Sequence, residues 1–168
     1  MTARKIVLID GYNAIHRISE LKRGLDSGGL ENARSNLALL ISGWGRSRPG
    51  TEFVIVFDGD AKFSGNRDQR LAGIRCIFTQ ASRGGDFEII RFVRDWRGDK
   101  SDITVVSDDN NVSNNCRAHG ANVQPSSFIM AAIKRPSPSG SKASADGKHI
   151  NRKAAEDINA ELRKKFGL

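Results

Sequence analysis

The chain has 168 residues, and its 27 Lys and Arg residues outnumber its 19 Asp and Glu residues to give a formal net charge of +8. This length predicts one domain with its own hydrophobic core, and 38% hydrophobic with 27% charged residues is typical of a globular protein. The sequence contains no run of ~20 apolar residues that could span a membrane and no recognisable secretory leader. Cys76 and Cys116 lack the spacing of a zinc site, so we expect two buried thiols in a cytoplasmic protein.

Five segments are predicted to be strands, and helical patterns alternate with them. In chain order, the strands are Lys5–Ile9, Glu52–Phe57, Arg75–Thr79, Ile103–Ser107 and Asn122–Gln124. The helices are Leu30–Trp44, Asp86–Trp96, Asn110–His119 and Ser126–Ile133. The strongest strands are rich in β-branched residues without alternation, which favours burial on both faces of a sheet. This order of elements indicates an α/β fold with a parallel sheet.

The composition changes after residue 134. Residues 135–149 are rich in Ser, Pro and Gly without a large apolar side chain, which predicts a flexible linker. From residue 150 onward an apolar residue recurs at every fourth position, which predicts an amphipathic helical tail over 150–168. We therefore expect a folded domain over residues 1–134, followed by the linker and a basic tail.

Aspartates follow the predicted strands. Asp10, Asp58 and the pair Asp108-Asp109 each end a strand, and Asp86 begins a helix after another strand. Each of them alone can be explained as a turn residue or a helix cap. Ligands of an open parallel sheet bind beyond the carboxyl ends of its strands, so together these acids would converge and repel one another. A cation would relieve this repulsion, and ligation by oxygen alone favours Mg²⁺ or Mn²⁺ and a metal-activated water for phosphoryl transfer.

Several motifs resemble the YacP-like branch of the NYN domains, within the PIN-like nucleases. They read LIDGYNAI at residues 8–15, VFDG at 56–59, VVSDD at 105–109 and GANV at 120–123. The likeness covers roughly residues 4–134. It implies a three-layer α/β/α PIN-like fold with a mostly parallel sheet of about five strands. It also implies a metal-dependent endoribonuclease that acts on single-stranded RNA, and it raises association with the ribosome.

The resemblance implies a role for each acid. Asp10, Asp86 and Asp108 would be the metal-binding residues, Asp58 would support them, and Asn13 would order the site. Wider PIN-like patterns could instead place Asp109 opposite the fourth acid, so Asp108 is the preferred metal ligand and Asp109 stays open as the alternative.

One segment departs from the family pattern. The family usually has Ala-Asp before the helix that carries its third acid, whereas this chain has Gly84-Gly85 before Asp86. The glycine pair predicts a loosened loop that weakens the position of Asp86, with Glu88 as a partial substitute.

Basic residues near the predicted site could hold the substrate. The candidates that would contact backbone phosphates are Lys62, Arg67, Arg70 and Arg83, with the basic tail as a further source of affinity. Two alternatives to an endoribonuclease stay open: an RNA-binding or scaffold protein with a decayed site, and a DNA-directed nuclease. A phospho-accepting receiver domain ranks last, because its expected Lys after a later strand has no clear counterpart here.

Overall fold

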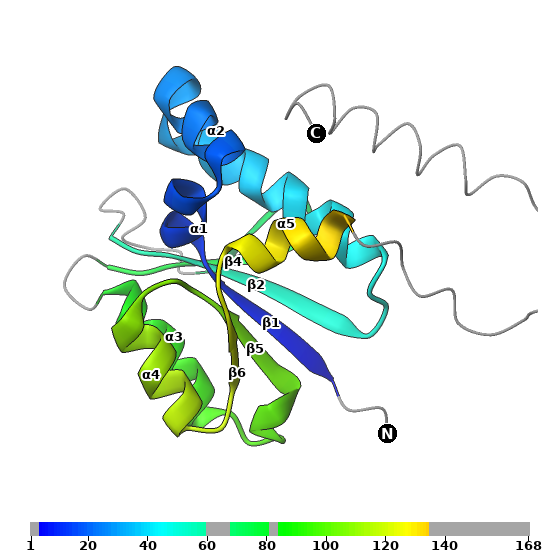
Figure 1. Ribbon diagram of the computed structural model, residues 1–168, viewed down its shortest axis with the longest axis vertical. Helices are drawn as coiled ribbons and strands as arrows, with labels where there is room; N and C mark the ends of the chain where they lie inside the picture. The colour runs from blue at the N-terminus through cyan, green and yellow to red at the C-terminus, as the bar shows by residue number, and fades with distance from the viewer. Residues whose placement is uncertain (1–3, 60–67, 81–83, 135–168) are drawn as a thin grey trace, which may run out of the picture. The chain divides into compact units, whose positions relative to one another are not determined.

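The computed structural model describes residues 4–59, 68–80 and 84–134, and residues 1–134 form one compact unit. Figure 1 shows the elements in chain order: β1 Lys5–Asp10, α1 Gly11–Arg17, α2 Ser19–Arg46, β2 Thr51–Phe57, β3 Asp68–Leu71, β4 Ile74–Phe78, α3 Gly85–Asp95, the 3₁₀ helix η2 Lys100–Asp102, β5 Ile103–Val106, α4 Asn110–Ala118, β6 Asn122–Gln124 and α5 Ser127–Lys134. None of the described helices is long and apolar enough to cross a membrane. The predicted linker and tail lie outside the described residues.

The sheet has six strands in the order β3-β4-β2-β1-β5-β6. All neighbouring pairs are parallel except β3 and β4, which are antiparallel. The mostly parallel α/β architecture is confirmed, but the sheet has one strand more than predicted. The additional strand is β3, whose Asp-Gln-Arg-Leu sequence carries no apolar run because it lies at the edge of the sheet with one face partly exposed.

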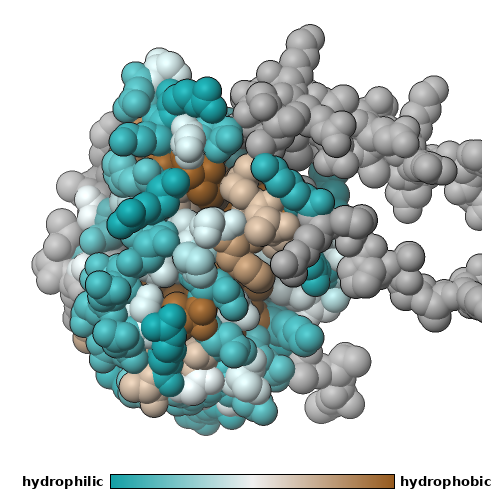
Figure 2. Space-filling view, in the orientation of Figure 1, coloured by the Kyte–Doolittle hydropathy of each residue, from teal (hydrophilic) through white to brown (hydrophobic). Residues whose placement is uncertain are grey.

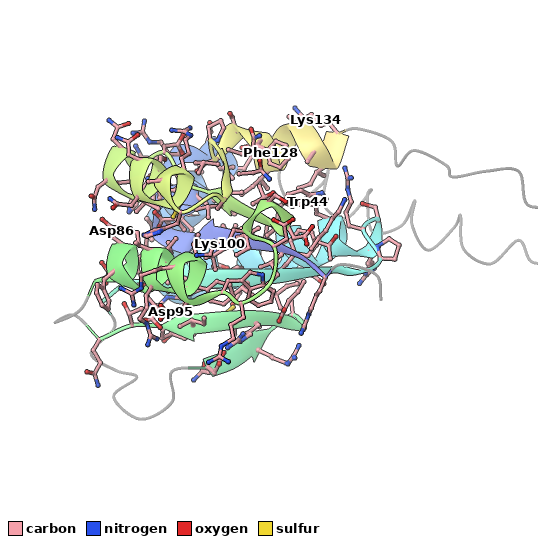
Figure 3. All side chains as sticks on the ribbon, turned by 90° about the horizontal axis from the view of Figure 1, so that it is seen from below. Trp44, Asp86, Asp95, Lys100, Phe128 and Lys134 are labelled. Atoms are coloured by element: carbon pink, nitrogen blue, oxygen red, sulfur yellow. The ribbon has the colours of Figure 1, made fainter. Side chains whose placement is uncertain are left out.

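Helices cover both faces of the sheet (Figure 1). α3 and α4 lie on one face, and α1, α2 and α5 lie on the other. The first face is packed by alternate strand residues against the two helices: Ile6, Leu8, Val54, Val56, Ile77, Ile103 and Val105 with Ile89, Val93, Val112 and Cys116. On the second face, Trp44 of α2 contacts Phe53 of β2 and Phe128 of α5, with ring centroids 4.9 and 5.8 Å apart (Figure 3). The two cysteines are free and buried, as predicted.

α2 is longer than the predicted helix. It runs over Ser19–Arg46 with a kink at Gly29, whose φ of 76° interrupts the helical backbone. The predicted Leu30–Trp44 segment is the part that follows the kink. In the part before it, residues 19–28, eight residues are polar or glycine and only Leu21 is buried, so the sequence shows no clear helical periodicity there. The described surface in the view of Figure 2 is mostly hydrophilic, with apolar side chains gathered over α5.

Candidate active site

The carboxyl ends of β1, β2 and β5 bring polar side chains to one edge of the sheet. Ile9 of β1 pairs with Val106 of β5, so the residues that follow them, Asp10 and Ser107, are neighbours. Side chains alternate between the two faces of a strand. Because Leu8 faces α3 and α4, Asp10 is directed to the same face.

The carboxylate of Asp10 is held through both of its oxygens. Oδ2 accepts a hydrogen bond from Ser107 Oγ at 2.9 Å, and Oδ1 accepts one from the backbone N–H of Asn13 at 3.4 Å. Asp10 is thereby the N-cap of α1. The helix begins directly against the sheet because Gly11 has no side chain: a Cβ there would lie 2.5 Å from the Phe57 ring. The chain therefore presents Asp10 in one defined orientation.

Ser107 links Asp10 to Asp109. The Ser107 hydroxyl oxygen accepts a hydrogen bond from the Asp109 N–H at 3.1 Å while it donates to Asp10. Asp109 in turn caps α4, because its Oδ1 accepts the N–H of Val112 at 3.0 Å. Ser107 is buried and was not among the residues singled out from the sequence. Its position two residues after the buried Val105, on the same face as Asp10, is the signal that could have identified it.

Asp86 lies in the first turn of α3, next to the start of α4. Its side chain accepts a hydrogen bond from Asn111, which belongs to the first turn of α4. Gly84 before it has a φ of 69°, a left-handed conformation that a residue with a Cβ adopts only at a cost. Gly85 is buried at the start of α3, and residues 81–83 of the preceding loop lie outside the described residues, so the predicted loosening of this loop stays a prediction. The expected substitute, Glu88, is engaged in an ion pair with Arg91.

The acids of this edge influence each other's protonation. The pKa of Asp10 is raised to about 6: burial is the largest cause, the hydrogen bonds from Ser107 and Asn13 lower the pKa, and the negative charges of Asp86 and Asp109 add to the rise. The pKa of Asp86 is also raised, first by burial and then by the charges of Asp109 and Asp58, while Asn111 lowers it. Repulsion among neighbouring carboxylates is therefore a feature of this edge.

Asp108 lies toward a different part of the structure from Asp109. Its N–H donates to Asn13 Oδ1 at 2.9 Å, and its Oδ2 accepts the N–H of Ser126 at 3.2 Å, immediately before α5. Ser126 Oγ also donates to Asn13 Oδ1, at 3.2 Å. Asn13 and Asp108 thus join α1, the end of β5 and the start of α5. Of the two adjacent aspartates, Asp109 is the one whose charge acts on Asp10 and Asp86.

The family of the chain is shown by a comparison with family models. The model of the YacP-like NYN domain matches residues 7–167. The chain belongs to this family. YacP-like NYN domains are a branch of the PIN-like nucleases, as the motifs around Asp10 and Asp109 led us to expect.

Solved structures show the same fold. The structure is similar to the crystal structure of Rae1 (YacP) from Bacillus subtilis, with a TM-score of 0.64 and 21% identity over 95% of this chain and 83% of that chain. A single-substitution mutant of the same protein gives a TM-score of 0.61 and 20% identity over 95% of this chain and 80% of that chain. No curated protein sequence matches the chain.

Of the residues predicted to contact phosphates, the structure describes Arg70 alone. Lys62, Arg67 and Arg83 lie outside the described residues. Arg70 lies on β3 opposite Arg75, three residues before the carboxyl end of β4, and its guanidinium donates to the carbonyl of Gly73 at 3.0 Å. At about 3.3 Å per residue, this places its backbone roughly 10 Å from the carboxyl edge of the sheet.

The donor set at this edge suits a hard divalent cation. It consists of carboxylate, amide and hydroxyl oxygens, which Mg²⁺ and Mn²⁺ prefer. Burial and then repulsion by neighbouring acids raise the pKa values of Asp10 and Asp86, and a cation would relieve the repulsion. Within residues 4–59, 68–80 and 84–134, no group of three or more His, Cys, Asp or Glu side chains is already arranged to hold a metal ion. The residues present fit the cation by the type of their donor atoms, not by a ready-made arrangement.

Proposed function

We propose that this chain is a metal-dependent endoribonuclease that hydrolyses phosphodiester bonds of single-stranded RNA in the cytoplasm. The observation that carries the proposal is the electrostatic coupling of Asp10, Asp86 and Asp109 at the carboxyl edge of the sheet. In a member of a PIN-like nuclease family, a cluster of mutually repelling carboxylates at this edge is best explained as a site for a cation and a phosphate.

Asp10, Asp86 and Asp109 would hold Mg²⁺ or Mn²⁺ in this proposal. We place Asp109 in the set instead of Asp108, because the carboxylate of Asp108 accepts the N–H of Ser126 at the start of α5. Asp58 is the supporting acid, since its charge also acts on Asp86. When bound, the cation would polarise the scissile phosphate and lower the pKa of an attacking water.

Ser107 and Asn13 orient the aspartates of the site through hydrogen bonds. Ser107 donates to Asp10 Oδ2 and so favours the ionised carboxylate, which is the form that binds a cation. It also receives the N–H of Asp109, so one hydroxyl sets the spacing of two proposed ligands. Asn13 holds the neighbouring Asp108 toward α5 and keeps that backbone turn in place.

The test is a cleavage assay on a mixed pool of single-stranded and structured RNAs with Mn²⁺, Mg²⁺ or EDTA. The intact protein is compared with Asp10→Asn and with Asp26→Asn, a matched change at an exposed aspartate of α2. We expect metal-dependent cleavage that Asp10→Asn abolishes and Asp26→Asn preserves.

Other results of the same assay would replace the proposal. RNA binding without cleavage under every metal would indicate a binding module with a decayed site. Preferential cleavage of DNA competitors would indicate a DNA-directed nuclease. The ribosome is a further proposed partner from the family resemblance, and co-sedimentation with ribosomes would test it.

A further inference from the structure

We propose that Thr79 is a positioning residue for this site: its hydroxyl holds Asp58 against the first turn of α3 and thereby sets the position of Asp86. The inference rests on the proposed function, because it assigns Asp86 to the metal-binding set. Neither Thr79 nor Gly85 belongs to the motifs that identify the family in this sequence.

The hydroxyl of Thr79 lies at the centre of a small hydrogen-bond network. Thr79 follows β4, is only 6% exposed, and its N–H donates to the carbonyl of Phe57 at 2.9 Å. Its Oγ1 lies 3.1 Å from Asp58 Oδ1 and 3.5 Å from the Phe57 carbonyl oxygen, and it accepts the N–H of Gly59 at 3.4 Å. A hydroxyl has one proton, and the shorter bond to a charged carboxylate is the stronger one. Thr79 therefore donates to Asp58.

Asp58 also packs against Gly85, the first residue of α3. A Cβ on Gly85 would lie 2.9 Å from Asp58 Cβ, 3.4 Å from its Cγ and 3.5 Å from its Cα. These atoms belong to the backbone or the root of the side chain, so they cannot move aside as the end of a flexible side chain would. Only glycine allows this approach, and the next residue is Asp86.

The two contacts connect the end of β4 to Asp86. Thr79 restrains the Asp58 side chain, Asp58 lies under Gly85, and Gly85 carries Asp86 into the first turn of α3. The second glycine of the pair that departs from the family pattern, Gly85, is thus closely packed against Asp58. Residues that orient metal ligands typically change metal affinity or activity by about 10- to 100-fold when they are replaced.

The test compares Thr79→Val with Thr79→Ser. Valine keeps the branched shape and removes the hydroxyl, whereas serine keeps the hydroxyl. Thr104→Val is the matched control, because Thr104 is a half-buried threonine of β5 in the same sheet. The measurements are the Mn²⁺ concentration that gives half-maximal RNA cleavage, the KM for RNA, and the rise in Tm that Mn²⁺ causes without RNA.

We expect Thr79→Val to raise the half-activating Mn²⁺ concentration about tenfold and to reduce the Mn²⁺-induced rise in Tm, with KM for RNA unchanged. Thr79→Ser and Thr104→Val should behave as the wild type. Gly85→Ala is an independent variant that leaves the Thr79 hydroxyl intact, and it should weaken the response to Mn²⁺ in the same direction because its Cβ displaces Asp58 from α3.

Two results would overturn the positioning role while leaving the proposed function in place. One is a wild-type response to Mn²⁺ in both Thr79→Val and Gly85→Ala. The other is an equal loss in Thr79→Val and Thr79→Ser, which would show that packing and not the hydroxyl matters. A wild-type protein that neither cleaves RNA nor gains Tm with Mn²⁺ would overturn the proposed function, and the positioning role with it.

Discussion

The two ends of α3 place the same residue type in opposite electrostatic surroundings (Figure 3). At the start of the helix, burial and the charges of Asp109 and Asp58 raise the pKa of Asp86. At its end, the guanidinium of Arg94 hydrogen-bonds Asp95 at 2.8 Å and lowers the pKa of that carboxyl. The environment supplied by the fold, rather than the residue type, decides which aspartate is available to bind a cation.

The same contrast runs across the sheet. Away from the carboxyl edge, acids lie beside arginines: Arg4 pairs with Glu52 at 2.9 Å, and Arg75 pairs with Asp68 at 2.8 Å. At the carboxyl edge, Asp10 has acids as its charged neighbours in the described part of the chain. A fold gains no stability by gathering like charges, so a cluster that persists points to binding.

The largest expected effect separates the two adjacent aspartates. Asp109→Asn keeps an N-cap for α4 but removes a charge that acts on Asp10 and Asp86. We expect it to lower the Mn²⁺-dependent kcat/KM for RNA at least about a hundredfold, because a metal ligand contributes several kcal/mol to the transition state. Asp108→Asn can still accept the N–H of Ser126 and should cost less than about tenfold. The reverse ranking would return Asp108 to the metal-binding set.

A second experiment measures the free-energy cost of burying the charged Asp10 beside other acids in the metal-free protein. The folded pKa of Asp10 is about 6, above its ordinary 3.8, so folding favours the protonated form and stability falls as the pH rises from about 4 to 6. Asp10→Asn cannot ionise and should be more stable than the wild type at pH 7 in EDTA, by up to about 3 kcal/mol. Urea unfolding at pH 4 and pH 7 checks this, with the difference vanishing at pH 4. A less stable Asp10→Asn at pH 7 would contradict the assignment.

The smallest effect is expected at the paired end of the sheet. The pKa of Asp68 is lowered by its hydrogen bonds from Arg75, so this pair stabilises the protein above the ordinary pKa of Asp68 and the gain is lost as the pH falls through the lowered value. Both side chains are more than a third exposed, which limits the cost of Asp68→Asn at pH 7 to about 0.2–1 kcal/mol. The cost should shrink in 1 M salt. A loss that salt leaves unchanged would mean that the pair acts through packing rather than charge.

Local patterns in the sequence predicted most of the sheet and the edge that carries the acids. Buried parallel strands appear as short β-branched runs, and their carboxyl ends share one edge whatever the strand order, so Asp10 and Asp58 could be placed there without coordinates. β3 was not predicted because an exposed edge strand needs no apolar run, and the turn that joins it to β4 has Ala72 at a φ of 49° before Gly73 at a φ of 81°, so only its second residue is a typical turn residue.

The tertiary structure decided which neighbouring residues act together. Asp108 and Asp109 are adjacent in sequence, yet one bonds the start of α5 and the other lies among the acids, because consecutive side chains leave a strand end in different directions. The sequence determined that acids meet at one edge, since each acid follows a strand and the carboxyl ends of parallel strands share one edge in any order. The orientation of each acid depends on hydroxyls such as that of Ser107, 97 residues away from Asp10, and no local pattern encodes such a contact.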